Sequence, residues 1–178
     1  RIQNIFNSNN SDCELEFRFG FKKQVFSPNI SIGHFNMLKH KLGKYKYLEK
    51  EIIIYDDCRS VNGKVETKHN IVNIDIKLGH YDVRFSQSKE TKVDKCVSKP
   101  KFIRNKMIWL YTFNNYNIEL CIVNDKYECE IEFTKFNLSA KEIFEPVSML
   151  MSIINEYQSV VKVINNYFFV FSYCNYSF

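Results

Sequence analysis

Charged and apolar side chains alternate strictly in several short segments of this chain, and this alternation limits the possible folds more than any other feature. In residues 13–19, Glu14, Glu16 and Arg18 share one face, while apolar side chains occupy the other. Successive side chains of a β-strand point to opposite sides, so this pattern is typical of a strand with one polar and one buried face. The segment therefore predicts a β-strand.

Residues 126–134 repeat the pattern, with Glu128, Glu130 and Glu132 on one face. Carboxylates at alternate positions of one strand lie about 7 Å apart and repel one another. Such a row is costly unless cations or a metal ion face it. A closed barrel would turn the charged faces inward, so that acidic strands face basic strands across a lumen.

The periodicity elsewhere predicts further strands and two helices. Strands are expected at residues 51–61, 64–71, 80–90, 101–113 and 117–123. The first two of these form a hairpin, because Asn62-Gly63 supplies the positive φ angles of a two-residue turn. Helices are expected at residues 31–46 and 139–157, whereas residues 160–178 receive no assignment. The layout indicates a single α+β domain over residues 1–178.

Composition excludes several classes of protein. The chain has 178 residues, of which 45% are apolar, so it can build a core and is not a disordered polymer. Its apolar runs are too short to cross a bilayer, and no membrane partner is expected. The net charge of +5 permits a polyanionic ligand without demanding one, because an AT-rich coding sequence would also enrich lysine. Six scattered cysteines argue against a zinc site or a disulfide framework and favour a reducing, intracellular setting.

The charged faces suggest a phosphate-handling metal site. Carboxylate oxygens are hard ligands that suit Mg²⁺ or Mn²⁺. Glu14 and Glu16, with one glutamate of the last strand, could supply three of them. Arginine and lysine across the lumen would bind phosphates, and a carboxylate not bound to metal could orient a water molecule.

Less specific interpretations exist for each element of this pattern. A single Glu-x-Glu strand usually has a solvated face, and Arg84 or Lys106 alone would be an ordinary ion pair or surface cation. The four histidines lack partners at ligand spacing and are interpreted as packing or surface residues. Acidic strands at both ends of the pattern, with basic strands between them, favour the interior site.

Five segments, in order, resemble the metal-dependent RNA 5′-triphosphatases of the triphosphate tunnel metalloenzyme superfamily, which occur in fungi, protozoa and large DNA viruses. Residues 14–20 and 127–133 are similar to the first and last signature strands of that family. Between them lie Asp82-x-Arg84-x-Ser86, the basic Arg104-Asn105-Lys106 and the acidic segment around Glu119. The resemblance spans about residues 12–135.

The resemblance implies an eight-stranded antiparallel β-barrel resting on helices. It implies removal of the γ-phosphate from 5′-triphosphate RNA ends, with Mg²⁺ or Mn²⁺ as cofactor, as the first step of mRNA capping. A guanylyltransferase domain would follow in the same polypeptide. Carried over by motif position, the metal ligands are Glu14, Glu16 and Glu132; the residues that position water or basic side chains are Glu128 and Glu130; the phosphate-binding residues are Arg84, Arg104 and Lys106; and Glu119 lies on the acidic strand.

Two departures from the family pattern affect this interpretation. Ile108 stands where many members have a second arginine, so one phosphate contact is absent or comes from elsewhere. The first strand carries Arg18 in place of the lysine of the thiamine-triphosphatase and class IV adenylyl-cyclase branch, which favours RNA as substrate. Further residues expected to face inward are Arg18, Arg59, Lys68 and Glu90.

Two alternatives remain open at this stage. One is a tunnel phosphohydrolase of tripolyphosphate or nucleoside triphosphates, and the other is a non-catalytic barrel that binds polyanions. The AT-rich composition suggests a giant virus, which would place the protein in the virion or in a cytoplasmic viral factory.

Overall fold

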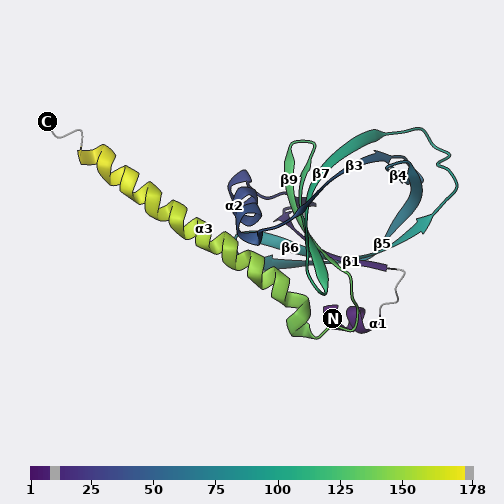
Figure 1. Cartoon of the computed structure of the whole chain (residues 1–178), viewed down its shortest axis with the longest axis horizontal. Coiled ribbons are helices and arrows are strands. Elements are labelled where there is room, and N and C mark those ends of the chain that lie inside the picture. The colour runs from purple at the N-terminus through teal and green to yellow at the C-terminus, as the bar shows by residue number, and fades with distance from the viewer. Residues whose placement is uncertain (9–12, 175–178) are drawn as a thin grey trace.

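The computed structural model describes residues 1–8 and 13–174, with side chains through residue 162. Its elements are shown in Figure 1. In chain order they are α1 (Ile2–Ser8), β1 (Cys13–Lys22), β2 (Phe26–Pro28), α2 (Ile32–Leu42), β3 (Lys46–Ile54), β4 (Arg59–Val61), β5 (Lys64–Leu78), β6 (Tyr81–Lys92), β7 (Phe102–Thr112), β8 (Tyr116–Val123), β9 (Lys126–Phe133) and α3 (Ala140–Cys174).

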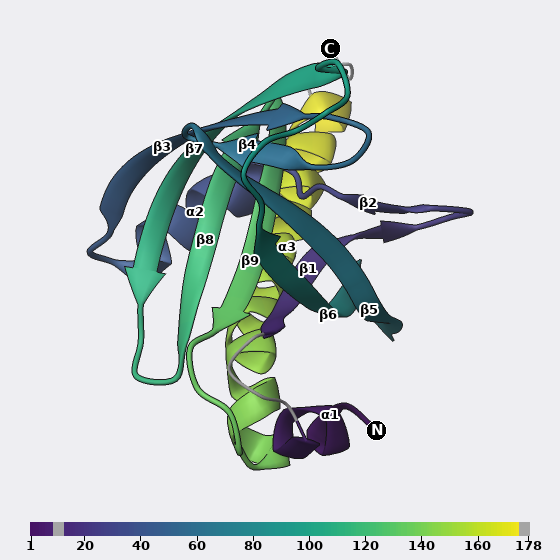
Figure 2. The same cartoon turned by 90° about the vertical axis from the view of Figure 1, so that its right-hand side faces the viewer.

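Eight of the strands close into an antiparallel barrel, as the sequence resemblance implied. Their order is β1-β6-β5-β4-β3-β7-β8-β9, and pairing of β1 with β9 closes the ring. The remaining strand, β2, extends β1 as a short hairpin that projects from the barrel (Figure 2). Closure leaves one charged face of each strand on the inside, where the charges can compensate one another.

The hydrophobic core lies outside the barrel, between its outer surface and the helices. On β1 the residues Leu15, Phe17 and Phe19 are fully buried, and they belong to one cluster with side chains of β6, β8 and β9. Helix α3 covers this face with Ile143, Val147, Leu150 and Ile154, while α1 adds Ile2 and Phe6. The apolar half of each alternating strand is therefore buried by helices, and its polar half faces the lumen.

Both longer helices begin with side-chain caps. Ser31 caps α2 by accepting a hydrogen bond from the backbone N–H of His34. Ser139 and Glu142 cap α3 reciprocally, because each side chain accepts from the other residue's backbone N–H. His34 is buried and hydrogen-bonds through Nδ1 to the hydroxyl of Tyr81 at 2.7 Å, which supports its interpretation as a packing residue. Among the described helices, none combines the length and the apolar character that a bilayer crossing needs.

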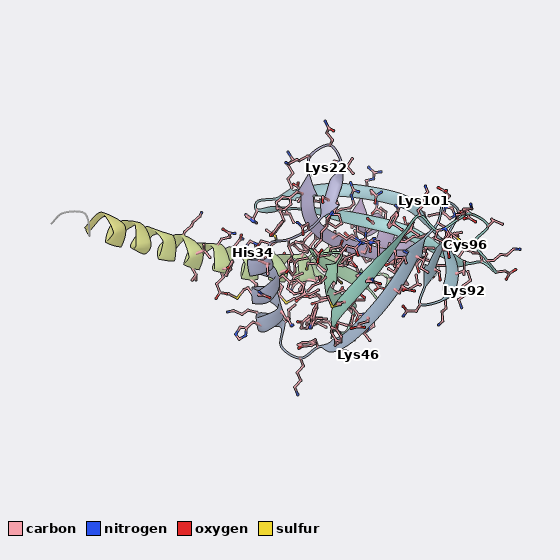
Figure 3. All side chains as sticks on the ribbon, turned by 90° about the horizontal axis from the view of Figure 1, so that it is seen from above. Lys22, His34, Lys46, Lys92, Cys96 and Lys101 are labelled. Atoms are coloured by element: carbon pink, nitrogen blue, oxygen red, sulfur yellow. A yellow bond between two sulfur atoms is a disulfide. The ribbon has the colours of Figure 1, made fainter. Side chains whose placement is uncertain are left out.

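The structure differs from the sequence expectations in several places: α1 and β2 were not predicted, β3 begins within the helix expected at residues 31–46, and β5 extends the strand expected at residues 64–71. The expected strand at residues 51–61 is interrupted, because a turn closed by the Tyr55 N–H and the Cys58 carbonyl separates β3 from β4. Residues 160–174, left unassigned above, continue α3. The argument against disulfides was wrong for one pair: Cys58 and Cys96 are bonded, with Cα atoms 5.7 Å apart. This pair joins the β3–β4 turn to the segment after β6, at the end of the molecule where Figure 3 labels Cys96.

The hairpin of β1 and β2 depends on the absence of a side chain at Gly20. A Cβ atom at this position would lie 2.2 Å from the backbone oxygen of Ser27. We expect Gly20→Ala to lower the free energy of unfolding by roughly 1–3 kcal/mol, since the strands must move apart. Chemical denaturation measures this loss. Gly63→Asn is the matched control, because asparagine tolerates the positive φ angle at residue 63 and nothing lies close to it; equal losses in both variants would contradict this explanation.

Candidate active site inside the barrel

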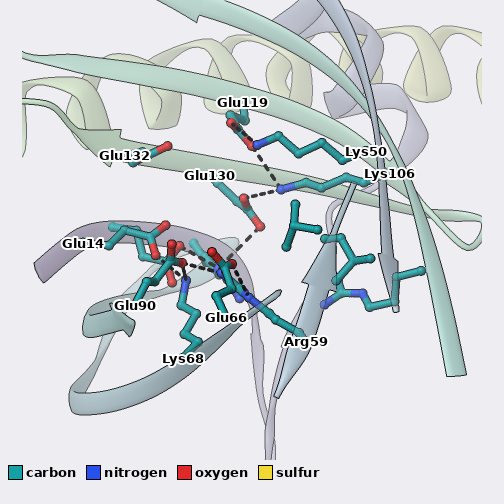
Figure 4. Close-up of a pocket in the computed structure, with 15 residues that line it drawn as sticks. Glu14, Lys50, Arg59, Glu66, Lys68, Glu90, Lys106, Glu119, Glu130 and Glu132 are labelled. Carbon is teal, nitrogen blue, oxygen red and sulfur yellow. Dashed lines mark hydrogen bonds and ion pairs between the residues drawn. The ribbon is translucent and has the colours of Figure 1, made fainter. Parts of the chain in front are cut away.

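The inward faces of the strands enclose a charged cavity of about 300 Å³ (Figure 4). Of the described residues, seven carboxylates line it: Glu14, Glu16, Glu66, Glu90, Glu119, Glu130 and Glu132. Six cations line it with them: Arg18, Lys50, Arg59, Lys68, Arg104 and Lys106. The alternation predicted from the sequence therefore places acidic and basic strands across a common interior.

A bulge in β5 keeps its polar residues on the inside along its length. The register shifts between Asn70 and Val72, so that Lys68 pairs with Glu90 before the bulge and Asp75 pairs with Arg84 after it. One extra residue in a strand exchanges the two faces for all the side chains that follow it. Without the bulge, the second half of β5 would turn its charges toward the outer surface.

Lys106 joins two acidic strands at the centre of the cavity. Its Nζ lies 2.7 Å from Oε2 of Glu130 and 3.0 Å from Oε2 of Glu119. Burial opposes a charged amine, but the two carboxylates dominate and raise the pKa of Lys106 well above its usual value. Burial likewise opposes ionisation of Glu130, yet Lys106 and Arg18 lower its pKa strongly. Glu130 is thus an anion that orients two cations and is a poor proton acceptor.

Arg18 connects β1 to β9. Its Nη2 donates to Oε2 of Glu16 at 3.0 Å, and its Nε lies 3.4 Å from Oε1 of Glu130. The two strands pair directly, with Glu16 opposite Glu132 and Arg18 opposite Glu130. The first and last signature segments are therefore neighbours in the closed barrel, as a shared site between them requires.

A second network covers the opposite wall. Lys68 pairs with Glu14 and, at 3.5 Å, with Glu90. Arg59 pairs with Glu66 at 2.6 Å and also contacts Glu90. Burial favours the neutral form of Glu14, but the charge and hydrogen bond of Lys68 outweigh it and lower the pKa of Glu14. Arg59, Lys68 and Glu90, which were secondary expectations from the sequence, thus face the cavity as expected.

Glu132 differs from its neighbours because it makes no hydrogen bond or ion pair with the described residues. Burial, followed by the charges of Glu14 and Glu119, raises the pKa of Glu132 to about 7. The residue opposite it on β8 is Asn117, whose buried Oδ1 also lacks a partner among the described residues. Two oxygen acceptors without donors therefore lie on facing positions of β8 and β9.

The structure holds the nine predicted site residues in different ways. Glu14, Glu16, Glu119, Glu130 and Glu132 line the main cavity with Arg104 and Lys106. Glu128 is buried and pairs through Oε1 with Nη2 of Arg104 at 3.4 Å. Burial raises the pKa of Glu128, with the charge of Glu130 adding to the effect. The roles assigned to these residues from the sequence resemblance remain predictions.

Arg84 lies apart from the main cavity. Its guanidinium binds Asp75, with Nε 2.7 Å from Oδ1 and Nη2 3.0 Å from Oδ2, and it stacks over the ring of Phe26. It lines a separate hollow of about 330 Å³ together with Asn73. The two hollows share Glu16, Arg18, Arg59, Lys68 and Arg104, so Arg84 lies along the continuation of the lumen.

Sequence reasoning missed two residues of the cavity, Lys50 and Glu66. Both lie in segments that were assigned only as strands or loops, without a charged motif to single them out. Strand pairing shows which residues of β3 and β5 face the lumen. On β3, pairing with β7 places Lys50 opposite Lys106. Ile108, the departure noted above, is fully buried in a small apolar cluster with Cys121 and Val123 and brings no charge to the cavity.

Comparison with known proteins identifies the fold. No protein-family model and no curated protein sequence matches the chain. Among solved structures, the S. pombe Pct1 RNA triphosphatase superposes with a TM-score of 0.66 at 15% sequence identity. The match covers 88% of this chain and 88% of that one. The structure of Pct1 in complex with the Spt5 CTD gives the same TM-score and identity. The mimivirus capping enzyme triphosphatase superposes with a TM-score of 0.58 at 14% identity, covering 86% and 95%. The chain thus has the fold of these RNA triphosphatases, which confirms the fold that the sequence resemblance implied.

The network around Lys106 predicts a large effect on stability. We expect Lys106→Met to lower the free energy of unfolding by about 3–5 kcal/mol, because Glu119 and Glu130 would remain buried without their shared cation. Lys41→Met is the control, since its ion pair with Glu156 is exposed and should be worth roughly 0–1 kcal/mol. Denaturant titration of both variants gives the comparison. A Lys106→Met protein as stable as Lys41→Met would show that the network contributes little.

Proposed function

We propose that this protein is a divalent-metal-dependent phosphohydrolase that removes the γ-phosphate from 5′-triphosphate RNA. The observation that carries the proposal is the cavity of paired carboxylates and cations inside a closed barrel, in a chain that has the same fold as the Pct1 and mimivirus triphosphatases. Cations at fixed positions inside a barrel suit a linear polyanion such as a triphosphate. The enclosure also limits bulk water around the reacting phosphate.

Charge balance supports the proposal of a metal ion. The seven carboxylates of the cavity outnumber its six cations. A triphosphate adds several further negative charges to this space, so without a metal ion electrostatic repulsion would weaken its binding to the six cations. A divalent cation offsets part of that repulsion, and the carboxylates released from their cations become available to it.

The oxygen chemistry of the residues on β1, β8 and β9 suits such an ion. Glu132 and Asn117 Oδ1 are oxygen acceptors without partners in the described structure, and oxygen donors are those that Mg²⁺ and Mn²⁺ prefer. Glu16 lies opposite Glu132, and Glu14 lies on the same face of β1. We propose Glu14, Glu16 and Glu132 as the metal-binding residues. A bound ion would polarise a phosphoryl oxygen and neutralise charge that develops there.

The remaining residues bind and orient the phosphates. Arg18, Lys68 and Arg104 are held by carboxylates at defined positions, so their donors are pre-organised for phosphate oxygens. Glu130 keeps Lys106 and Arg18 in place. Glu128 retains a buried oxygen, Oε2, without a partner among the described residues, and its pKa is raised, so it is the better candidate to orient a water molecule.

The wider context of the reaction is part of the proposal. A 5′-triphosphate RNA end is the expected substrate, and the product would be a diphosphate end suitable for a guanylyltransferase, which we place in the same polypeptide. An intracellular location is consistent with this task. The alternative substrates, tripolyphosphate and free nucleoside triphosphates, share the same phosphate chain and are separated by direct competition.

A competition assay tests the substrate and the ligand set together. With Mg²⁺ or Mn²⁺, we expect faster phosphate release from triphosphate-ended RNA than from ATP or tripolyphosphate at equal concentration. Glu14→Gln and Glu132→Gln should each reduce the rate by at least about 100-fold, since each removes a charged ligand. Glu49→Gln, on the outer face of β3, is the control and should retain the wild-type rate. RNA as the poorest substrate would overturn the RNA assignment, and active glutamine variants would overturn the metal site.

Metal affinity should depend on pH through Glu132. Its pKa of about 7 means that this carboxyl holds a proton at pH 6 and loses it by pH 8. Because a metal ion must displace that proton, we expect Mn²⁺ to bind more weakly at pH 6, with a dissociation constant about tenfold larger than at pH 8. Calorimetric titration at the two pH values measures it, and raising the Mn²⁺ concentration should restore activity at pH 6. An affinity independent of pH would mean that Glu132 is not a ligand.

A further inference from the structure

Lys50 occupies a position in the cavity that neither the sequence motifs nor the roles above account for. It lies on β3 directly opposite Lys106 of β7, and it lines the main cavity. Its amine points toward Glu119 near the unpaired Glu132 (Figure 4). Its side chain is 37% exposed, against 11% for Lys106, so the amine remains accessible from the lumen.

The other cations of the cavity are engaged more closely than Lys50. Lys106 and Arg18 each have a carboxylate oxygen within 3.0 Å, Arg59 has one at 2.6 Å, and Lys68 contacts Glu14. The only ion pair of Lys50 within the described residues is 3.8 Å long, to Oε1 of Glu119, whose other oxygen already binds Lys106. This distance exceeds that of a hydrogen bond. The three N–H donors of Lys50 are therefore available to a ligand.

The inward-facing residues that follow Lys106 on β7 and flank Lys50 on β3 carry no charge. On β7, Arg104 and Lys106 face inward, and the next inward residue is the apolar Ile108, which is buried with Cys121 and Val123. On β3, the inward neighbours of Lys50 are Leu48 and Ile52. Lys50 thus lies beside Lys106, but of the described cations that line the cavity it alone makes no hydrogen bond to a carboxylate, and Glu132 likewise has no hydrogen-bond donor among the described residues. A cation and an anion that both lack close partners mark the place where an ionic ligand completes the site.

We propose that Lys50 is a phosphate-binding residue of this cavity, which contacts a terminal phosphate oxygen on the side of the lumen where Ile108 provides no charge. The proposal rests on the proposed function for its ligand class, a linear polyphosphate end. It assigns a role to a residue outside the recognised strand motifs. Lys50 acts there as a mobile point charge, in contrast to the arginines, which carboxylates hold in fixed orientations.

Binding of inorganic tripolyphosphate tests this role without requiring turnover. Isothermal titration calorimetry at low ionic strength, with EDTA present, compares the wild type with Lys50→Met and Lys50→Arg. We expect Lys50→Met to weaken binding about tenfold or more, because a charge-assisted hydrogen bond is lost. Lys50→Arg should stay within about threefold of the wild type, since it keeps the charge. Lys89→Met is the matched control, as Lys89 is exposed on the outward face of β6, and it should bind as the wild type does.

The possible outcomes separate this proposal from the proposed function. Unchanged binding by Lys50→Met, an equal loss in Lys89→Met, or no binding by the wild type would each overturn the role of Lys50. A selective loss in Lys50→Met would support it even if the wild type failed to hydrolyse RNA, which would overturn only the proposed function. Thermal unfolding monitored by circular dichroism shows whether each variant is folded. We expect Lys50→Met to unfold at nearly the wild-type temperature, because its only ion pair is long.

Discussion

Mutual neutralisation of charges inside a closed barrel is the interaction on which this structure depends. Three glutamates on one face of β9 would repel one another if no cations faced them. In the barrel, Lys106 and Arg18 both form ion pairs with Glu130, and Arg104 forms an ion pair with Glu128. Removing Lys106 or Arg104 deprives a buried carboxylate of a cation, so the site and the stability of the barrel rest on the same contacts.

The position of the hydrophobic core follows from this arrangement. With the lumen filled by charge, the apolar faces of β1, β6, β8 and β9 must be covered from outside, and α1 and α3 provide that cover. The site is therefore built on strands whose backs are fixed by a packed core, which restrains the inward side chains. Such rigid support favours precise placement of several charges around a substrate.

The alternation of residues allowed the barrel and much of its lining to be predicted, because the two-residue period directly determines which face a side chain occupies. It could not place Lys50 or Glu66, whose direction depends on pairing across the sheet and not on a local charged motif. Arg84 was expected in the same site as Lys106, but its pairing with Asp75 holds it further along the lumen. The Cys58–Cys96 bond joins residues 38 apart and depends on a tertiary turn, which spacing alone does not show.

The most direct test of the account is to locate Mn²⁺ by anomalous diffraction in crystals grown with Mn²⁺ and tripolyphosphate. The account predicts one strong anomalous peak inside the barrel, bonded to Glu132 and to the inward glutamates of β1, with tripolyphosphate along the basic side chains. A peak confined to the outer surface, with the interior carboxylates still paired to their cations, would contradict it.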